Sequence, residues 1–379
     1  MKRGTDKPAE SGTRYLDLFR DREFSALFAA DVASRIGSQL GKFALAALVY
    51  YKTRSLTATA ATFAITYLPG IIGGPILSAL ADRLPRKPLL VTCDLIRAGL
   101  MLAITLVNMP IWTALALLLV VELVKVPFSS ARMAMLADIL QGPRFAAGNA
   151  LVGASQQAVQ VIGFGFGAVL VAQLGPQIAL LMDTASYGVS ALLIGTLVRY
   201  RPAPQATEPG KRPNLLKDTV AGVRVVHETG RMPTLFWLLF LGPTVLATAE
   251  GLAIPYANLL DAEQLAGIFL AATPAGTVIG LSVVGRMSQR NREKVLIPFS
   301  LVVGVCVAVT ALVPIPFVIV LSLFVAGLAM GHLAHLQASI VGLVTSAVRG
   351  RVIGLANTVL QIGQALAILL AGIVADATS

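Results

Sequence analysis

Charged residues are scarce in this chain of 379 residues: Asp, Glu, Lys and Arg make up 13% of it, whereas hydrophobic residues make up 56%. A soluble domain has about a quarter charged residues. An ordinary soluble enzyme, a disordered protein and a fibrous protein are therefore excluded. Alternating polar and apolar strands are missing as well, which excludes an outer-membrane barrel. The sequence instead contains apolar blocks of roughly 20–30 residues, each long enough to cross a bilayer as a helix.

Cysteine is nearly absent. Cys93 and Cys306 both lie inside apolar blocks, with no spacing typical of a disulfide or a metal site. The sequence contains no Gly-x-x-x-x-Gly-Lys-Ser/Thr loop for a nucleotide, and no nucleophile–base pair or metal cluster. We therefore expect no cofactor, no bound metal and no enzymatic activity. Residues 1–23 are polar and do not resemble a signal peptide.

Hydropathy predicts an all-α polytopic protein with about eleven membrane-spanning helices. The predicted spans are 24–51, 57–81, 88–108, 110–137, 146–173, 176–198, 233–259, 264–285, 295–313, 316–345 and 351–376. A long polar stretch with four prolines separates the sixth span from the seventh. We therefore expect an N-terminal segment (1–23), a first helical bundle (24–199), a linker with a surface amphipathic helix (200–232) and a second bundle (233–379).

Positive charge is placed asymmetrically. The chain has 30 Lys and Arg against 19 Asp and Glu, a net charge of +11. These basic residues occur in every second loop, while the opposite loops offer only Lys52 and Arg54. Cytoplasmic loops carry such an excess, so the N-terminus and the linker are predicted to be cytoplasmic. A nucleic-acid partner is not expected, because no aromatic and basic surface accompanies the charge.

Two stretches of the chain resemble each other across the linker. Gly73 and Arg83 match Gly276 and Arg286 at an offset of about 203, and Asn149 and Gln156 match Asn357 and Gln364 near 208. Such offsets indicate duplication of a six-helix unit. Moved by the same offset, the span 176–198 predicts a further helix at about 384–406. We therefore interpret the chain as a fragment that lacks a twelfth helix.

The segment after the second span combines small and charged residues, Gly74-Pro-Ile-Leu-Ser-Ala-Leu-Ala-Asp82-Arg83-Leu-Pro-Arg86-Lys87. It resembles the loop motif Gly-x-x-x-Asp-Arg-x-Gly-Arg-Lys of the major facilitator superfamily, with Pro85 in place of a glycine. The resemblance implies two pseudo-symmetric six-helix bundles and a cytoplasmic gate. We assign to this gate motif Gly74, Asp82, Arg83, Arg86, Lys87, Asp94, Arg97 and Arg286.

Within the family, the chain resembles the bacterial exporters related to enterobactin and macrolide efflux proteins. Ser34-Arg35-Ile-Gly37, Asp94-Leu-Ile-Arg97 and Asp183-Thr-Ala-Ser186-Tyr187 carry this resemblance. The segment Gly163-Phe-Gly-Phe-Gly167 lacks the Gly-Pro that is usual in the fifth helix of the family's drug/proton antiporters. The resemblance implies a multi-pass protein of the bacterial plasma (inner) membrane that exports a small compound.

Ionisable residues inside a span are costly and need a reason. Asp31, Glu122 and Glu250 are the candidates for proton coupling, with Arg35 holding Asp31 or an anionic group of a substrate. Each has a structural alternative: Asp31 and Arg35 are spaced for a stabilising ion pair, Glu122 for a local pair with Lys125, and Glu250 for a solvated place in an outer vestibule.

Other polar residues inside spans are candidates for the lining of a substrate cavity. Histidine titrates near neutral pH and could relay protons, and glutamine pairs three residues apart share a helix face. The cavity candidates are Arg35, Gln39, Gln157, Gln160, His332, His335, Gln361 and Gln364.

The sequence and the resemblance thus predict a secondary active transporter that exports a small amphipathic compound in exchange for protons. Its partners would be the substrate, protons and the lipid bilayer, and we expect a monomer. Two alternatives stay open: a metabolite uptake transporter of the same fold, and a non-transporting membrane receptor or assembly partner.

Overall fold

A computed structural model describes residues 15–72, 77, 80–202 and 223–378, without the side chains of residues 71, 72, 82, 346 and 347. Most of these residues are helical, and none of them forms a strand. Nine helices of the described part are long and apolar enough to cross a membrane. The predicted all-α membrane fold is therefore confirmed.

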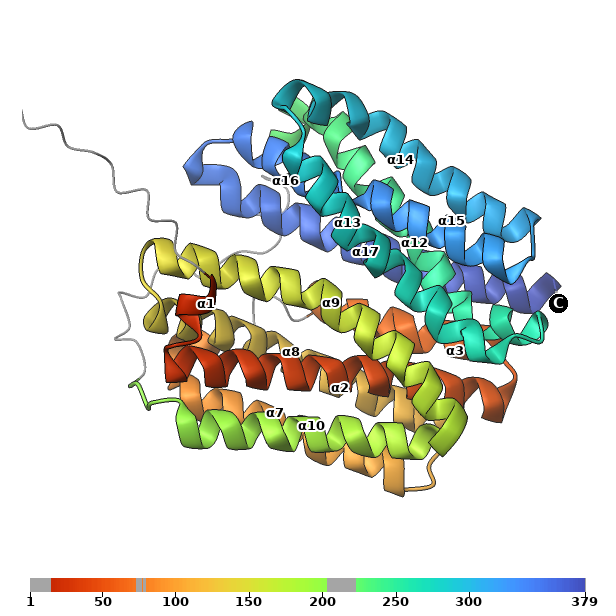
Figure 1. Cartoon of the computed structure of the whole chain (residues 1–379), viewed down its shortest axis with the longest axis horizontal. Coiled ribbons are helices and arrows are strands. Elements are labelled where there is room, and N and C mark those ends of the chain that lie inside the picture. The colour runs from red at the N-terminus through yellow and green to blue at the C-terminus, as the bar shows by residue number, and fades with distance from the viewer. Residues whose placement is uncertain (1–14, 73–76, 78–79, 203–222, 379) are drawn as a thin grey trace, which may run out of the picture.

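The helices form two groups that are successive in the sequence (Figure 1). The first half contains α1 (Tyr15–Leu18), α2 (Arg22–Thr53), α3 (Leu56–Ala64), η1 (Ile65–Tyr67), α4 (Leu68–Ile72), α6 (Leu80–Arg83), α7 (Arg86–Leu106), α8 (Ile111–Ile139), α9 (Pro143–Leu174) and α10 (Pro176–Leu197). The second half contains α12 (Met232–Leu259), η2 (Glu263–Leu265), α13 (Ala266–Arg286), α14 (Gln289–Leu312), α15 (Pro316–Met330), α16 (Leu333–Gly342) and α17 (Ser346–Thr378).

Local sequence sets where several helices begin. Asp21 caps α2 because its carboxylate accepts hydrogen bonds from the backbone N–H groups of Glu23 at 3.0 Å and Phe24 at 3.3 Å. Proline stands in the first turn of α9 and α10, where its missing N–H costs nothing. Gly175 joins these two helices with φ +82°, a conformation that suits glycine.

The polar linker between the two halves begins at one end of the molecule, and this end serves as a reference. Glu23, at the start of α2, accepts hydrogen bonds from the Arg199 N–H at 2.5 Å and from Arg201 Nη2 at 2.9 Å, just beyond the end of α10. We call this the linker end. The end at which α2 terminates at Thr53 is the far end. In Figure 1 the ribbons of the two halves separate toward the linker end and come together at the far end.

The halves contact each other through two interfaces that the sequence repeat relates. In one, Gly267 of α13 packs against Phe164 and Ala168 of α9; in the other, Gly372 of α17 packs against Ala60 of α3. Gly267 follows Ala60, and Gly372 follows Phe164, by nearly the offset that relates the two repeats. The two contacts are therefore counterparts, and glycine permits the close approach in both.

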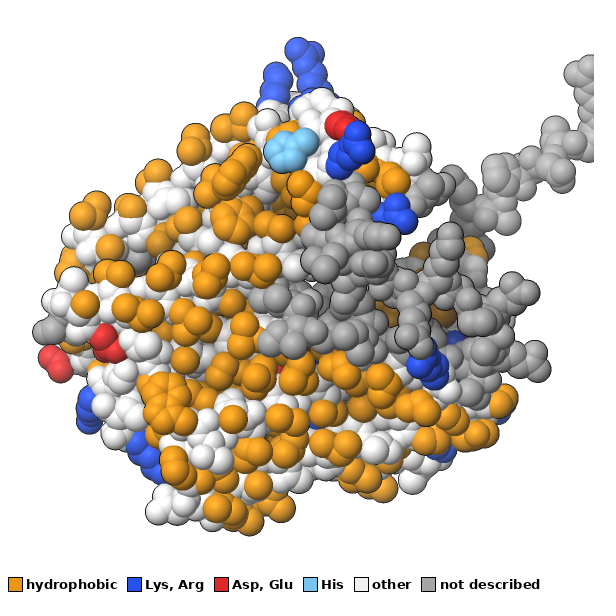
Figure 2. Space-filling view, turned by 180° about the vertical axis from the view of Figure 1, so that it is seen from behind, with side chains coloured by type: hydrophobic (Ala, Val, Ile, Leu, Met, Phe, Trp, Pro, Cys, Tyr) orange, Lys and Arg blue, Asp and Glu red, His pale blue; other side chains and the backbone are white. Residues whose placement is uncertain are grey.

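The outer surface is apolar, as a helix that faces lipid requires. Figure 2 shows hydrophobic side chains across the middle of one face, with charged side chains at its margins. Leu301 and Val305 on α14 are 65% and 62% exposed. Exposed apolar surface of this extent is a liability in water, whereas acyl chains solvate it.

The predicted span 316–345 is divided into α15 and α16 by a turn at Gly331 and His332. The turn is locked against α13: a Cβ on Gly331 would overlap the backbone of Gly280, and one on Gly276 would overlap the carbonyl oxygen of Phe324. Glycine thus lets the backbones of α13 and α15 touch. Hydropathy alone does not predict this turn, because α15 and α16 are both apolar.

The amphipathic linker helix lies mainly outside the described residues, including Leu215, Leu216 and Val220. Its last part is described: residues 223–228 are helical. Val226 is buried against Met232 and Leu235, whereas Val223 is exposed. The described part of this helix therefore packs against the start of α12.

Candidate functional site

A cavity of about 630 Å³ lies between the two halves. The first half contributes its polar and charged lining: Asp31, Ser34, Arg35, Ser38, Gln39, Lys42, Thr66, Tyr67, Arg97, Glu122, Lys125, Ser129, Arg132, Gln156, Gln157 and Gln160, with Phe128, Val159 and Phe164. The second half contributes a mainly apolar wall: Pro243, Leu246, Ala247, Ala249, Phe269, Leu270, Pro274, Leu323, Met330 and Leu333, with Glu250, Thr273, Thr277 and Gln364. The cavity is amphipathic.

Asp31 binds two guanidinium groups at once. Its carboxylate lies 3.0 Å from Arg35 Nε, one turn along α2, and 3.2 Å from Arg132 Nε on α8. Arg132 Nη1 also donates to Asp31 Oδ2 at 3.3 Å. The Asp31 side chain is 4% exposed and that of Arg132 is 9% exposed, whereas that of Arg35, which lines the cavity, is 23% exposed. The predicted Asp31–Arg35 pair is present, with Arg132 added from another helix.

Glu122 and Lys125 form the local pair that was one of the two interpretations of this helix. Lys125 Nζ donates to Glu122 Oε2 at 3.0 Å, and both residues line the cavity. The ammonium is the more exposed partner, with 46% of the Lys125 side chain accessible against 10% of Glu122. The Glu122 carboxylate therefore lies in the cavity wall beneath a more exposed counter-charge on its own helix.

Glu250 is the only acidic residue of the second half that lines this cavity in the described part of the chain. It binds the first half: Lys42 Nζ lies 3.5 Å from its Oε1, and the Tyr67 hydroxyl donates to its Oε2 at 2.8 Å. Its side chain is 22% exposed. Glu250 thus joins the two halves through polar contacts. Its partner Lys42 lies in the part of α2 that leads to the far end.

Asp94 and Arg97, which the sequence assigns to the gate motif, lie away from the linker end of α7. Arg97 follows the start of α7 at Arg86 by about 16 Å of helix rise, which puts it near the middle of α7 and at the cavity. Its Nη1 donates to Asp94 Oδ1 at 3.1 Å, and its guanidinium lies 4.0 Å from the centre of the Tyr187 ring. The pair is buried inside the first half.

Three predicted cavity residues lie elsewhere. His332 is fully buried in the second half: its Nδ1 lies 2.7 Å from the Ala329 carbonyl oxygen and its Nε2 lies 3.1 Å from Ser300 Oγ. His335 is buried on α16 and does not line the cavity either. Gln361 packs against Gly70 between α17 and α4. Both histidines, at and just after the turn at Gly331, are thus buried within the second half.

The other predicted cavity residues, Arg35, Gln39, Gln157, Gln160 and Gln364, all line the cavity, as do Asp31, Glu122 and Glu250. Lys42 and Tyr67 also line it and were missed. A usable pattern existed for Lys42, because it shares a helical face with Asp31, Arg35 and Gln39 at spacings near multiples of 3.6 residues. No comparable pattern marks Tyr67, which lies in the short helix η1.

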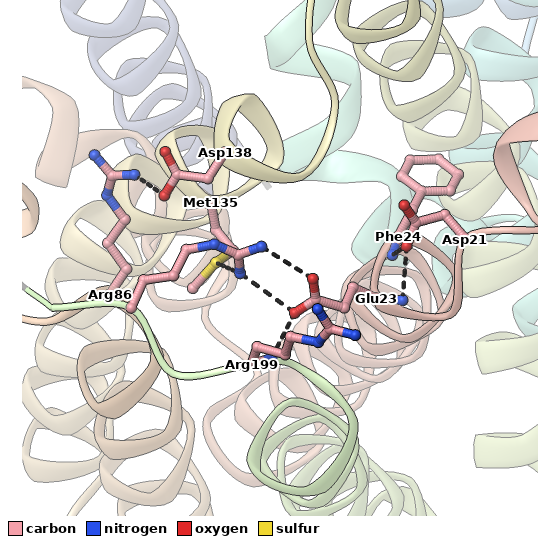
Figure 3. A network of polar contacts seen from close by, with 8 residues as sticks. Asp21, Glu23, Phe24, Arg86, Met135, Asp138 and Arg199 are labelled. Carbon is pink, nitrogen blue, oxygen red and sulfur yellow. Dashed lines mark hydrogen bonds and ion pairs between the residues drawn. The ribbon is translucent and has the colours of Figure 1, made fainter.

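Part of the gate motif can be followed at the linker end (Figure 3). Arg86 forms an ion pair with Asp138 and donates to the Ala134 carbonyl oxygen at 3.3 Å, so it joins α7 to α8 within the first half. Arg83 and Arg286 are exposed at the ends of α6 and α13. Gly74 and the Asp82 side chain lie outside the described residues.

Groups of three or more His, Cys, Asp and Glu that could hold a metal ion do not occur among the described residues. Two helical halves that enclose a central cavity are typical of one class of multi-pass membrane proteins, the facilitator-type transporters. The family model described as Major Facilitator Superfamily matches residues 27–368. The chain belongs to this superfamily.

Two relatives from Bacillus subtilis (strain 168) are similar in sequence. The uncharacterized MFS-type transporter YkuC is 31% identical over 182 residues, which cover 47% of this chain and 42% of YkuC. The uncharacterized MFS-type transporter YvqJ is 22% identical over 289 residues, 74% of this chain and 68% of YvqJ. The match therefore spans less than half the length of YkuC.

Solved structures share the fold at low identity. The nucleoside transporter NupG aligns with a TM-score of 0.73 at 14% identity, covering 93% of this chain and 90% of that one. A peptide transporter POT in complex with sulfate aligns at 0.71 and 14%, covering 94% and 92%. A bacterial homologue of the human lysosomal transporter Spinster, in an inward-facing and unoccupied conformation, aligns at 0.71 and 16%, covering 95% and 83%.

Proposed function

We propose that this protein is a secondary active transporter that exports a small amphipathic compound in exchange for protons. The observation that carries the proposal is the cavity between the halves, in which a charged wall from the first half faces an apolar wall from the second. A compound with one polar and one apolar side matches both walls. Rocking of the two halves about such a site provides alternating access.

Proton coupling is assigned to Asp31 and Glu122. Each carboxylate lies in the cavity wall beside a cation of its own helix, Arg35 at 3.0 Å and Lys125 at 3.0 Å. Protonation of such a carboxylate weakens its pairing with the cation, so the binding of a proton and the binding of a substrate at this pair depend on each other. This dependence is the coupling step that we assign to the two pairs.

The orientation is proposed from the loop charges: the linker end lies in the cytoplasm of a bacterial cell, and the far end lies outside. Contacts such as Lys42–Glu250 and Tyr51–Glu263, at 3.5 Å and 3.3 Å, then hold the halves together on the outer side of the membrane. Thiol labelling of single cysteines at Lys52 and Arg290 in intact cells tests this, because only the first position should react with an impermeant reagent.

A flux assay in proteoliposomes tests the coupling. With an imposed pH gradient and a pH dye in the lumen, addition of a transported amphipathic compound should release protons, and a panel of such compounds is screened in this way. Asp31→Asn and Glu122→Gln should each abolish the release. Asp17→Asn is the matched control, since Asp17 pairs with Arg20 on the surface at the linker end. Substrate flux that is unchanged when the gradient is collapsed contradicts proton coupling.

A further inference from the structure

The cavity holds more cations than its carboxylates can neutralise. Five Lys and Arg side chains line it, namely Arg35, Lys42, Arg97, Lys125 and Arg132, against the three acidic side chains Asp31, Glu122 and Glu250. Arg97 pairs with Asp94, a buried carboxylate that does not line the cavity. Lys125 pairs with Glu122 and Lys42 pairs with Glu250. The excess of positive charge therefore lies at Arg35 and Arg132, because these two side chains share the single carboxylate of Asp31.

The two guanidinium groups share Asp31 unequally. Arg132 uses both Nε and Nη1 and is largely enclosed. Arg35 reaches Asp31 through Nε, and within the described residues its two Nη atoms have no protein acceptor. An arginine fork binds a carboxylate or phosphate through two parallel hydrogen bonds. The Arg35 fork is thus partly used, and its open part faces the cavity.

Asp183, a further acid of the first half, does not reach this cluster of charges. Asp183 is buried between α10 and α2, where a Cβ on Gly37 or Gly41 would meet its side chain, and it does not line the cavity. The cavity wall beyond Arg35 continues with the neutral amides Gln39, Gln157 and Gln160. Amide N–H groups can donate to an anion without adding charge of their own.

The opposite wall of the cavity is apolar and can contact the hydrocarbon part of a ligand. Leu246, Phe269, Leu270, Leu323 and Met330 of the second half face the charged wall across the cavity. Burial of a ligand's hydrocarbon here is worth about 25 cal/mol per Å² of apolar surface. A simple inorganic anion would leave this wall unused, whereas an amphiphile covers it.

We propose that the cavity selects anionic amphiphiles: a carboxylate, or another oxyanion, binds the Nη atoms of Arg35, and an apolar body rests on the wall of the second half. This inference rests on the proposed function, because it names the chemical class of the compound transported. Asp31 then acts as the internal competitor of the substrate's anionic group for Arg35.

Equilibrium binding to the full chain in nanodiscs, without any ion gradient, tests the class of ligand. The probes are three molecules that differ in the head group: 2-naphthylacetate, 2-naphthylacetamide and 2-(2-naphthyl)ethylamine. The acetate should bind at least tenfold more tightly than the amide, and the amine should bind most weakly. Arg35→Gln should reduce the preference for the acetate to about twofold or less. Arg20→Gln, a surface change at the linker end, should leave the preference intact.

Asp31→Asn provides a second, independent readout. Removal of the internal competitor frees both guanidinium groups, so the affinity for 2-naphthylacetate should rise several-fold. The same variant should lose proton-coupled flux, so the two proposals fail separately. The inference is overturned if the amide or the amine binds as tightly as the acetate, if no saturable binding of the acetate occurs, or if Asp31→Asn leaves the acetate affinity unchanged or lowers it.

Discussion

The carboxylate of Asp376, near the end of α17, caps the first turn of α3 by accepting a hydrogen bond from the backbone N–H of Leu56 at 2.7 Å. It also accepts from the Thr57 N–H and from Ser55 Oγ, both at 2.9 Å. The contact joins the second half to the first at the far end. A carboxylate at a helix N-terminus is stabilised by the helix dipole and by the free N–H groups.

Asp376→Asn should weaken this contact by about 1–2 kcal/mol, because an amide has one acceptor oxygen in place of two and no charge. The halves should then separate more often at the far end. Spin labels on cysteines at Lys52 and Gln264, in a background without Cys93 and Cys306, should show a larger population at long distance by electron–electron double resonance.

Asp261→Asn is the matched control for that measurement. Asp261 lies at the same end, is exposed, and has φ +52°, a conformation that asparagine accepts. Its distance distribution should equal that of the unmodified protein. An unaltered distribution in Asp376→Asn would show that the cap does not hold the halves together.

The pair formed by Lys42 and Glu250 should contribute to the same closure. Lys42→Met and Glu250→Gln should each destabilise the closed arrangement, because each leaves a charge in the cavity wall without its partner. The exchange variant Lys42→Glu with Glu250→Lys should recover part of the loss. A double-mutant cycle on the label distances measures the coupling, expected at about 0.5–3 kcal/mol; strict additivity would exclude a direct interaction.

The contact of α13 with α15 should tolerate no side chain at Gly276. Its Cβ would overlap the carbonyl oxygen of Phe324, so Gly276→Ala must push the helices apart at a cost of about 1–3 kcal/mol. Gly304 on α14 has no atom within 4 Å of its Cβ position, and Gly304→Ala should therefore be neutral or stabilising. The midpoint of thermal unfolding in detergent distinguishes the two; equal midpoints would contradict the packing argument.

His332 should affect stability and leave ligand binding unchanged. Ser300→Ala removes the partner of His332 Nε2 and should lower the free energy of unfolding by about 1 kcal/mol. The affinity of the folded protein for naphthylacetate should stay the same, because neither residue lines the cavity. A change in the affinity without a change in the free energy of unfolding would show that His332 takes part in ligand binding.

Much of the candidate site could be read from the chain because the interior of a membrane makes charge informative. A charged side chain in a span is expensive, and this cost singles out Asp31, Arg35, Glu122 and Glu250 from the sequence; all four line the cavity. Neutral polar residues carry a weaker penalty. Gln39, Gln157, Gln160 and Gln364 line the cavity, whereas His332, His335 and Gln361 lie in the packing between helices.

The sequence by itself determined the helical membrane fold and the repeat, since hydropathy reports the solvent that each segment needs and duplication leaves similar residues at constant offsets. Only the tertiary structure decided which charges meet. The pairs Asp31–Arg132 and Lys42–Glu250 join residues 101 and 208 positions apart. The rotation of each helix about its axis brings them together, and that rotation depends on packing contacts that no single segment encodes.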